Sequence, residues 1–243
     1  MGFSENQKLK KQKYKNLLIA GLLILLAVLL IFVPLLVEEQ YMLASILFMV
    51  CSFFPLMIKY EHKKVTSKEL VLIAILGAIA AVSRVPFASI PSVQPTTFVI
   101  IMAGAVFGAE SGFVVGALAA IVSNIFLGQG PWTPWQMYAW GMVGFAAGLL
   151  KNTWVMKSSV GRSIFGFITG FLFGWFMNLW VVLTLMNSFN WAQFIGFYTA
   201  SFYFDLAHAL SNVFFIFFFY QSWYRIISRF KVKYGLLATE DEL

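Results

Sequence analysis

The chain has 243 residues, of which 60% are hydrophobic and 11% charged, and its formal net charge is +7. This composition excludes a soluble globular domain, and the single cysteine, Cys51, excludes a disulfide framework and a cysteine metal cluster. The apolar residues occur in runs of about twenty, the length that an α-helix needs to cross a bilayer core of roughly 30 Å. The sequence therefore predicts an all-α, polytopic membrane protein.

Eight apolar segments predict eight transmembrane helices. The first segment follows a lysine-rich start, but it has 21 residues and no small-x-small cleavage site, so we expect a retained helix rather than a signal peptide. The fourth segment is short, so we expect this helix to be tilted or to begin below the membrane surface. The predicted helices are 17–37, 41–59, 67–85, 95–108, 110–128, 134–150, 161–186 and 198–224.

The basic residues indicate the orientation of these helices. With eight spans and a cytoplasmic N-terminus, 16 of the 17 basic residues fall inside and only Arg84 falls outside, as the positive-inside rule requires. Both termini are then cytoplasmic, and the basic charge indicates contact with anionic lipid headgroups rather than with nucleic acid. The predicted outer segments are 38–40, 86–94, 128–133 and 187–197.

A change of composition divides the chain. The first two predicted helices are rich in leucine and phenylalanine, whereas glycine, alanine and isolated polar residues enter the spans from Thr66 onward. We therefore predict an N-terminal transmembrane hairpin over 1–60 and a six-helix functional core with a basic cytoplasmic tail over 61–243.

The depth of the polar residues in the core is informative, because polar groups inside a bilayer are costly. The inner halves of the core helices offer little beyond Ser163 and Thr169, whereas a channel or rocking transporter usually has polar lining on both sides of its site. The sequence thus predicts a cup that is open to the outside and closed below by apolar packing, which can capture a ligand but needs a larger movement to deliver it. The outer polar residues of the core helices are Arg84, Gln94, Thr96, Thr97, Ser123, Asn124, Thr133, Gln136, Asn178, Asp205 and His208.

The outer stretch "GQGPWTPWQM", Gly128–Met137, combines glycines, prolines, tryptophans and glutamines without a charge. Trp132 and Trp135, with Trp140 behind them, are suited either to stacking on a large conjugated ligand or to the interfacial aromatic belt. Amide side chains can donate and accept, so they suit a neutral ligand rich in amides and carbonyls, or they join helices to one another. The amides concerned are Gln94, Asn124, Gln129, Gln136 and Asn178.

Two charged features leave alternatives open. Asp205 and His208 are spaced i, i+3 on one helix face, which suits a structural pair, a hydrogen bond to a ligand or, less well for a lone histidine, a metal ligand. Arg84 at the end of its helix is placed either to reach lipid headgroups or to meet a ligand phosphate.

Small residues form a stripe on the first core helix. Ala74, Ala78 and Ala81, with Gly77 beside them, have the small-xxx-small spacing that lets another helix approach closely in lipid. This spacing suits packing against the protein's own helices or docking of a partner. Similar glycine spacings in the helices at 110–128 and 134–150 predict intramolecular packing.

These residues resemble the substrate-binding S component of energy-coupling factor (ECF) transporters, which import vitamins into bacteria. The resemblance covers about 66–224 and rests on the alanine stripe, the loop "VPFASIPSVQPTTF" and the block "FGAESGFVVGALAAIVSNIFLGQGPWTPWQM". That block is similar to the group of S components associated with cobalamin (vitamin B12) uptake.

The resemblance implies a multi-pass protein of the bacterial plasma membrane with an outward-facing substrate pocket. It implies docking on a transmembrane T component through Ala74 and Ala78, two cytoplasmic ATPases that bind the ATP, and toppling of the S component to carry the pocket inward. No cofactor, metal or catalytic residue is expected in the chain itself, and the sequence contains no GxxxxGK[ST] motif for binding ATP.

The predicted function is therefore the substrate-specificity subunit of an ECF importer for cobalamin or a related corrinoid. An S component for a different vitamin or small nutrient is one alternative. A proton-coupled secondary transporter with Asp205 and His208 as its relay is another. A membrane-embedded enzyme is disfavoured, since the chain lacks an HExxH motif and a carboxylate pair at one depth.

Overall fold

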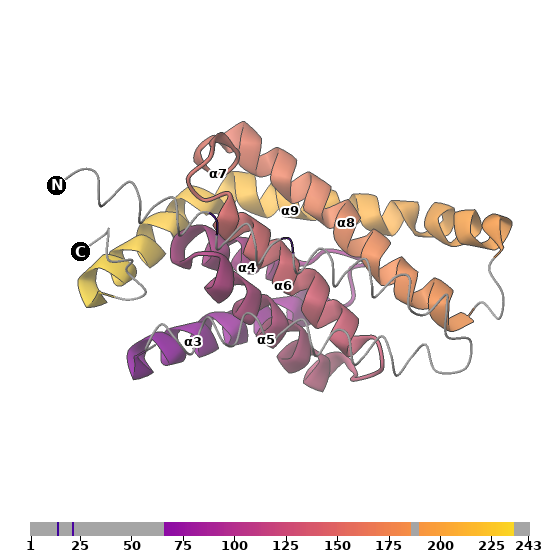
Figure 1. Cartoon of the computed structure of the whole chain (residues 1–243), viewed down its shortest axis with the longest axis horizontal. Helices are drawn as coiled ribbons and strands as arrows, with labels where there is room; N and C mark the ends of the chain where they lie inside the picture. Colours follow the sequence, from indigo (N-terminus) through magenta and orange to yellow (C-terminus); the bar gives the residue numbers. More distant parts are fainter. Residues whose placement is uncertain (1–13, 15–20, 22–65, 186–189, 236–243) are drawn as a thin grey trace. The chain divides into compact units, whose positions relative to one another are not determined.

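A computed structural model of the chain describes residues 66–185 and 190–235, together with the isolated residues Tyr14 and Gly21 (Figure 1). The chain divides into two units, Met1–Lys64 and Val65–Leu243. The predicted N-terminal hairpin, with its helices at 17–37 and 41–59, lies outside the described residues.

The described part of the second unit is helical and contains no β-strand. Four stretches are long and apolar enough to cross a membrane: Ser67–Phe87, Ala109–Leu127, Ser159–Leu183 and Trp191–Tyr234. This confirms the prediction of an all-α, polytopic membrane protein. The elements are α3 (Ser67–Arg84), the 3-10 turn η1 (Val85–Phe87), α4 (Pro95–Phe107), α5 (Ala109–Leu127), α6 (Thr133–Leu149), α7 (Trp154–Lys157), α8 (Ser159–Leu185) and α9 (Trp191–Tyr234).

Local sequence signals explain where the first helices begin and end. Thr66 caps α3 in a capping box, because its side chain accepts from the backbone of Glu69 while its own backbone N–H donates to the Glu69 carboxylate at 2.6 Å. Pro95 occupies the first position of α4, where a missing N–H is tolerated. Gly108 separates α4 from α5 with a φ of 99°, a conformation that favours glycine.

Helix α4 lies in the interior of the unit. All 13 of its residues are buried, and it contacts α3, α5, α6 and α9. In Figure 1, α8 and α9 run side by side along one edge while α3 to α6 gather beside them. Because other helices surround α4, its length is set by those helices rather than by the thickness of a bilayer.

Glycines allow α5 and α6 to approach backbone to backbone. A Cβ placed on Gly144 would meet the carbonyl of Gly112, and one placed on Gly116 would meet the carbonyl of Trp140. Gly104 of α4 is equally close to the backbone of Gly144. The prediction that the glycines of these two helices serve intramolecular packing is confirmed.

The last helix corrects the sequence prediction. We predicted a helix over 198–224, but α9 has 44 residues and a length of about 66 Å, roughly twice the bilayer core. It begins beside Asn190, whose side chain accepts from the backbone of Ala192 at 2.8 Å, and it ends at Gly235 with a φ of 59°. The prediction relied on the end of the apolar run, whereas an α-helix continues through polar sequence until a capping residue ends it.

Two smaller predictions about the segments beside these helices also change. The outer segment predicted at 187–197 belongs to α9 from Trp191 onward. The short helix α7 occupies part of the predicted connection before α8. The basic residues that were expected to follow the last helix lie within it: Arg225, Arg229, Lys231 and Lys233.

Candidate functional site

Arg84 ends α3 with its side chain turned into the helix bundle. One guanidinium nitrogen, Nη1, donates to Ser123 Oγ at 3.0 Å and to Asn124 Oδ1 at 2.8 Å on α5. The guanidinium carbon lies 5.1 Å from the centre of the Trp140 ring, which is within cation–π distance. The Arg84 side chain therefore contacts the helices of its own unit, and its meeting a ligand phosphate stays a prediction.

Asn124 is the centre of the hydrogen bonds around Arg84. It is only 2% exposed, and its amide nitrogen donates to Gln136 Oε1 at 2.8 Å and to Thr133 Oγ1 at 3.1 Å on α6. Thr133 in turn donates to Gln129 Oε1 at 2.9 Å, and Gln129 is anchored by its own bond to the carbonyl of Ile121. The side chain of Asn124 thus links α3, α5 and α6.

A second branch begins at Trp140. Its indole nitrogen donates to Thr97 Oγ1 at 3.1 Å, and the same hydroxyl shares a hydrogen bond of 2.8 Å with His208 Nε2 on α9. Phe173 stacks on Trp140 with ring centres 5.0 Å apart and meets His208 edge-on at 5.1 Å. Since Arg84 lies over Trp140, the two branches meet there.

We call the residues of both branches the polar cluster. It draws on α3, α4, α5, α6, α9 and the loop before α6. It unites eight of the fourteen predicted substrate-binding residues at one end of the unit and adds Ser123. Its members are Arg84, Thr97, Ser123, Asn124, Gln129, Thr133, Gln136, Trp140 and His208.

Asp205 and Asn178 lie in a different cluster, between α8 and α9. Asn178 donates to Ser201 Oγ at 2.6 Å, and Ser201 donates to Asp205 Oδ2 at 2.9 Å. The expected pair of Asp205 with His208 is therefore wrong, because each of them has found another partner. The proton relay on which the secondary-transporter alternative depended loses its basis. In the described residues, no group of three or more His, Cys, Asp and Glu side chains could hold a metal ion around His208.

The two other predicted residues at the start of α4, besides Thr97, differ in their surroundings. Thr96 donates to the carbonyl of Ala80 at 2.7 Å and so joins α4 to α3. The backbone N–H of Gln94 donates to Ser211 Oγ at 3.1 Å, while its side-chain Oε1 is buried without a hydrogen-bond partner in the described structure. An unpartnered buried oxygen is unusual in a folded protein, and it marks Gln94 as a group that a ligand could satisfy.

The two tryptophans of the loop stretch have different environments. Trp135 is 1% exposed and packs on Phe176 with ring centres 5.3 Å apart, so it belongs to the core. Trp132 is half-buried and meets Trp180 edge-on at 5.9 Å. Only Trp132 of this pair presents a face that a ligand could reach without repacking of the core.

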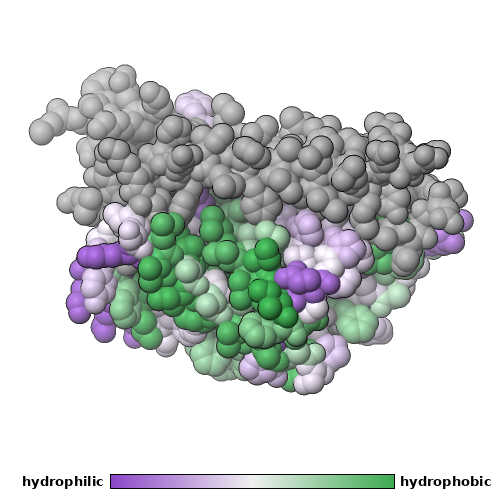
Figure 2. Space-filling view, turned by 90° about the horizontal axis from the view of Figure 1, so that it is seen from below, coloured by the Kyte–Doolittle hydropathy of each residue, from purple (hydrophilic) through white to green (hydrophobic). Residues whose placement is uncertain are grey.

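The alanine stripe of α3 is split between two faces. Ala74 and Ala78 are exposed, and they lie among exposed apolar side chains such as Val71 and Ile75. Ala81 is fully buried and faces inward with Ala80 and Leu76, so its place in a partner surface is wrong. The reason is geometric: at 100° per residue, a spacing of three places Ala81 about 60° around the helix from Ala78. Figure 2, seen from the side on which α3 and α5 lie in Figure 1, shows hydrophobic side chains gathered on this face.

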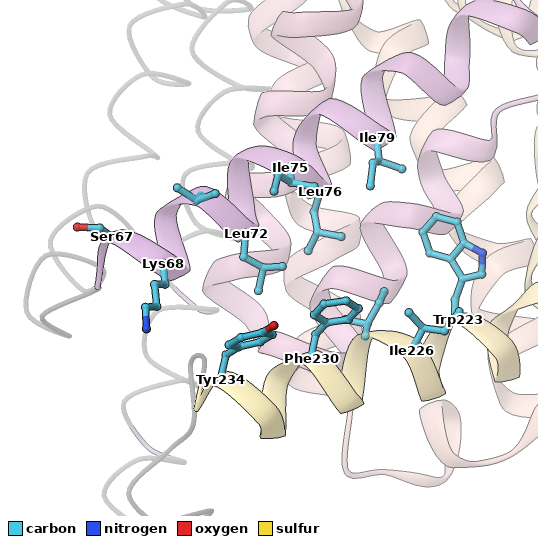
Figure 3. A pocket seen from close by; sticks show the side chains of 12 residues that line it. Ser67, Lys68, Leu72, Ile75, Leu76, Ile79, Trp223, Ile226, Phe230 and Tyr234 are labelled. Carbon is cyan, nitrogen blue, oxygen red and sulfur yellow. The ribbon is translucent and has the colours of Figure 1, made fainter.

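A groove of about 870 Å³ lies between α3 and the last turns of α9 (Figure 3). It begins at the Ser67 end of α3, whereas the polar cluster lies at the Arg84 end. Its lining offers few hydrogen-bonding groups and so suits an amide-rich ligand poorly; the polar cluster remains the candidate site. The groove is lined by Ser67, Lys68, Val71, Leu72, Ile75, Leu76, Ile79, Trp223, Ile226, Ile227, Phe230 and Tyr234.

Two serines of α9 that bond to predicted site residues were not predicted from the sequence. Ser201 joins Asn178 to Asp205, and Ser211 binds the start of α4. Neither serine was selected, because a serine within an apolar helix has the size and spacing of an ordinary packing residue. The signal that the sequence offers is their spacing on the helix: Ser201 lies four residues before Asp205, and Ser211 lies three residues after His208.

Comparison with known proteins shows the family to which the chain belongs. The family model described as "ECF transporter, substrate-specific component" matches residues 68–227. The chain is similar to a UPF0397 protein of Vibrio atlanticus (strain LGP32), with 30% identity over 89 residues, 35% of this chain and 48% of the relative. It is also similar to a UPF0397 protein of Aliivibrio fischeri (strain MJ11), with 30% identity over 105 residues, 41% of this chain and 56% of the relative. The chain thus spans about half the length of these curated relatives. No solved structure matches it significantly.

Proposed function

Because the chain belongs to the family of ECF transporter substrate-specific components, we propose that it binds cobalamin or a related corrinoid for import. The family is one of transport subunits rather than enzymes. On this proposal the protein resides in the plasma membrane of a bacterium as a multi-pass subunit. It needs no cofactor of its own, since the partner subunits bind the ATP.

The polar cluster is the observation that supports this proposal. Side chains from five helices converge at the end of the unit that the basic residues predict to be outside. Most of them are neutral amides, hydroxyls and indoles, which can donate and accept hydrogen bonds and stack on a flat ring. A corrinoid offers both a conjugated macrocycle and a periphery of amides, so its chemistry matches that of these groups.

The loop before α6 provides the route by which a ligand reaches the cluster. Gly128 and Gln129 are exposed, and Gly128 has a φ of 110°. Gln129 holds the loop by its bonds to Thr133 and to the carbonyl of Ile121. On this proposal the ligand replaces the bonds of Gln129 and lies against Trp132, so that the amides now bonded to one another turn to the substrate.

The exposed part of the alanine stripe is the proposed docking surface for the T component. Small side chains at Ala74 and Ala78 leave room for a partner helix to approach closely, which is how helices associate in lipid. Ala74 and Ala78 are exposed, whereas the side chain of Arg84 is bonded to α5, so on this proposal partner docking and substrate binding use different faces of α3.

Bulky residues on this surface are expected to separate the two activities. The double substitution Ala74→Leu and Ala78→Leu should reduce co-purification with the T component by at least about tenfold, or roughly 1.4 kcal/mol, because the helices can no longer approach. Binding of substrate by the isolated chain should be unchanged. Ala200→Leu, at an exposed alanine of α9, is the matched control. Normal assembly of the double variant would show that the T component docks elsewhere.

Binding by the isolated chain tests the proposed function. The purified full chain, reconstituted in lipid nanodiscs, should bind cobalamin saturably in a calorimetric titration without any partner subunit. The absence of binding would refute the vitamin assignment and leave the family unaffected.

A further inference from the structure

We infer that Arg84 binds an anionic group of the substrate, a carboxylate or a phosphate, at the polar cluster. This inference rests on the proposed function, because it assigns a role to one residue of the same site. It narrows the class of substrate to molecules that carry a negative charge beside their neutral hydrogen-bonding groups.

The first step is that Arg84 has only neutral partners in the described structure. Its hydrogen bonds end on a hydroxyl and an amide oxygen, and its ring contact is with an indole. Glu69 lies 15 residues away on α3, about 22 Å along the helix, and Glu110 lies 14 residues from Asn124 on α5, about 21 Å along that helix. Asp205 is bonded to Ser201 in the other cluster. None of these three carboxylates, the only ones among the described residues, forms an ion pair with Arg84.

The second step is the cost of leaving that charge unpaired. Arg84 is half-buried within a stretch that can span a membrane, and charged side chains there pair with one another, with backbone carbonyls or with a ligand. Neutral acceptors compensate a cation less well than an anion does, because an anion adds the Coulomb attraction between two full charges and a planar carboxylate or phosphate matches the guanidinium fork. An anion that binds Arg84 would therefore gain an interaction that no described residue supplies.

The third step is that the guanidinium has donors left for such an anion. Both described bonds use Nη1, and no described residue accepts from Nη2 or Nε. The N–H groups on Nη2 and Nε form a planar fork that matches the two oxygens of a carboxylate or phosphate. Ser123 and Asn124, at 0% and 2% exposure, hold the Nη1 side in place, so the fork is oriented before the ligand arrives.

Cobalamin permits a direct test, because it carries one phosphodiester in its nucleotide arm and cobinamide has the same macrocycle without that arm. Binding of both compounds is measured by calorimetry with the full chain in nanodiscs of neutral lipid. The variants are Arg84→Gln, which keeps a donor for Asn124, and Arg84→Lys, which keeps the charge without the fork. Lys68→Gln removes a cation from the opposite end of α3 and is the matched control.

The expected result is that Arg84→Gln weakens cobalamin binding by roughly 10- to 100-fold, the usual range for a hydrogen bond between charged groups, and weakens cobinamide binding by less than about tenfold. The affinity of Arg84→Lys for cobalamin should lie between those of Arg84→Gln and the unmodified chain. Lys68→Gln should bind both compounds with the affinity of the unmodified chain. Equal weakening for both compounds would show that Arg84 only positions its neighbours, and no weakening would show that it does not meet the ligand. The titration is repeated with anionic lipid in the nanodisc to distinguish a substrate phosphate from a lipid headgroup phosphate. If Arg84→Gln changes binding only in anionic lipid, Arg84 binds a headgroup and the inference is overturned.

A second measurement keeps the inference testable if the unmodified chain binds neither corrinoid. Thermal unfolding is then followed with biotin, pantothenate and pyridoxal phosphate, which carry carboxylate or phosphate groups, and with thiamine and riboflavin, which do not. Stabilisation by an anionic compound that is lost in Arg84→Gln would support the inference while the corrinoid assignment fails. Stabilisation only by thiamine or riboflavin, or by none of the five compounds, would overturn it.

Discussion

Cells that express this chain are expected to accumulate cobalamin only when its T component and two ATPases are expressed with it. The chain alone should give uptake no higher than background, because the polar cluster lies at one end of the described unit and, on the proposed function, inward delivery depends on the partner subunits. The 243 residues also contain no GxxxxGK[ST] motif, and on the proposed function the partner ATPases supply the energy for transport. The measurement is uptake of radiolabelled cobalamin in a host that lacks its own cobalamin importer.

The controls for this uptake experiment distinguish the two kinds of energy. An ATPase partner that cannot hydrolyse ATP should abolish uptake, and a protonophore given while ATP is maintained should have little effect. Uptake by this chain alone that a protonophore abolishes would contradict the account and support a proton-coupled transporter instead. The separate partners of Asp205 and His208 argue against that result.

The second large effect is expected for Asn124→Leu. Leucine has a similar volume, but it removes the acceptor for Arg84 and the donors to Thr133 and Gln136 in one step. Substrate affinity should fall by about 100-fold or more, equivalent to at least roughly 2.7 kcal/mol, because three groups of the polar cluster lose their fixed positions together. Calorimetric titration of the purified variant in nanodiscs measures this loss.

Two companion variants show whether the loss arises at the site. Asn152→Leu changes an exposed asparagine in the turn after α6 and should bind substrate normally. Asn124→Asp keeps an acceptor for Arg84 and should preserve folding, but its carboxylate pairs with the guanidinium and should therefore weaken the binding of an anionic substrate. If Asn124→Leu remains folded by thermal unfolding and binds substrate with unchanged affinity, the polar cluster is not the binding site.

Much of the fold of the second unit could be predicted from the sequence, because its helices end at residues with strong local preferences. The boundaries of α3, α4, α5, α6 and α8 lie within two residues of those predicted. Thr66, Pro95 and Gly108 mark three of these boundaries through capping, a fixed φ and a positive φ. The end of α9 was not predicted, since the apolar run stops near residue 224 while the helix continues to Gly235.

The candidate site could be predicted in its location but not in its contacts. The depth of polar residues in the predicted helices brought Arg84, Asn124 and Thr97 to the same end of the unit, and the structure confirms that they lie in one cluster. The partner of each side chain depends on how far each helix is rotated, which periodicity does not determine. That is why His208 binds Thr97 on another helix, and why Ala81 is buried while Ala78 is exposed.

Titration of the purified chain with cobalamin tests the central claim most directly, because it requires neither a partner nor a variant. The full chain in neutral-lipid nanodiscs is expected to bind cobalamin saturably at one site with a Kd of about 1 μM or tighter, equivalent to roughly 8 kcal/mol or more. Bound cobalamin should also remain with the protein through gel filtration and be visible by its absorbance. No heat of binding and no retained cobalamin at concentrations well above this Kd would contradict the account.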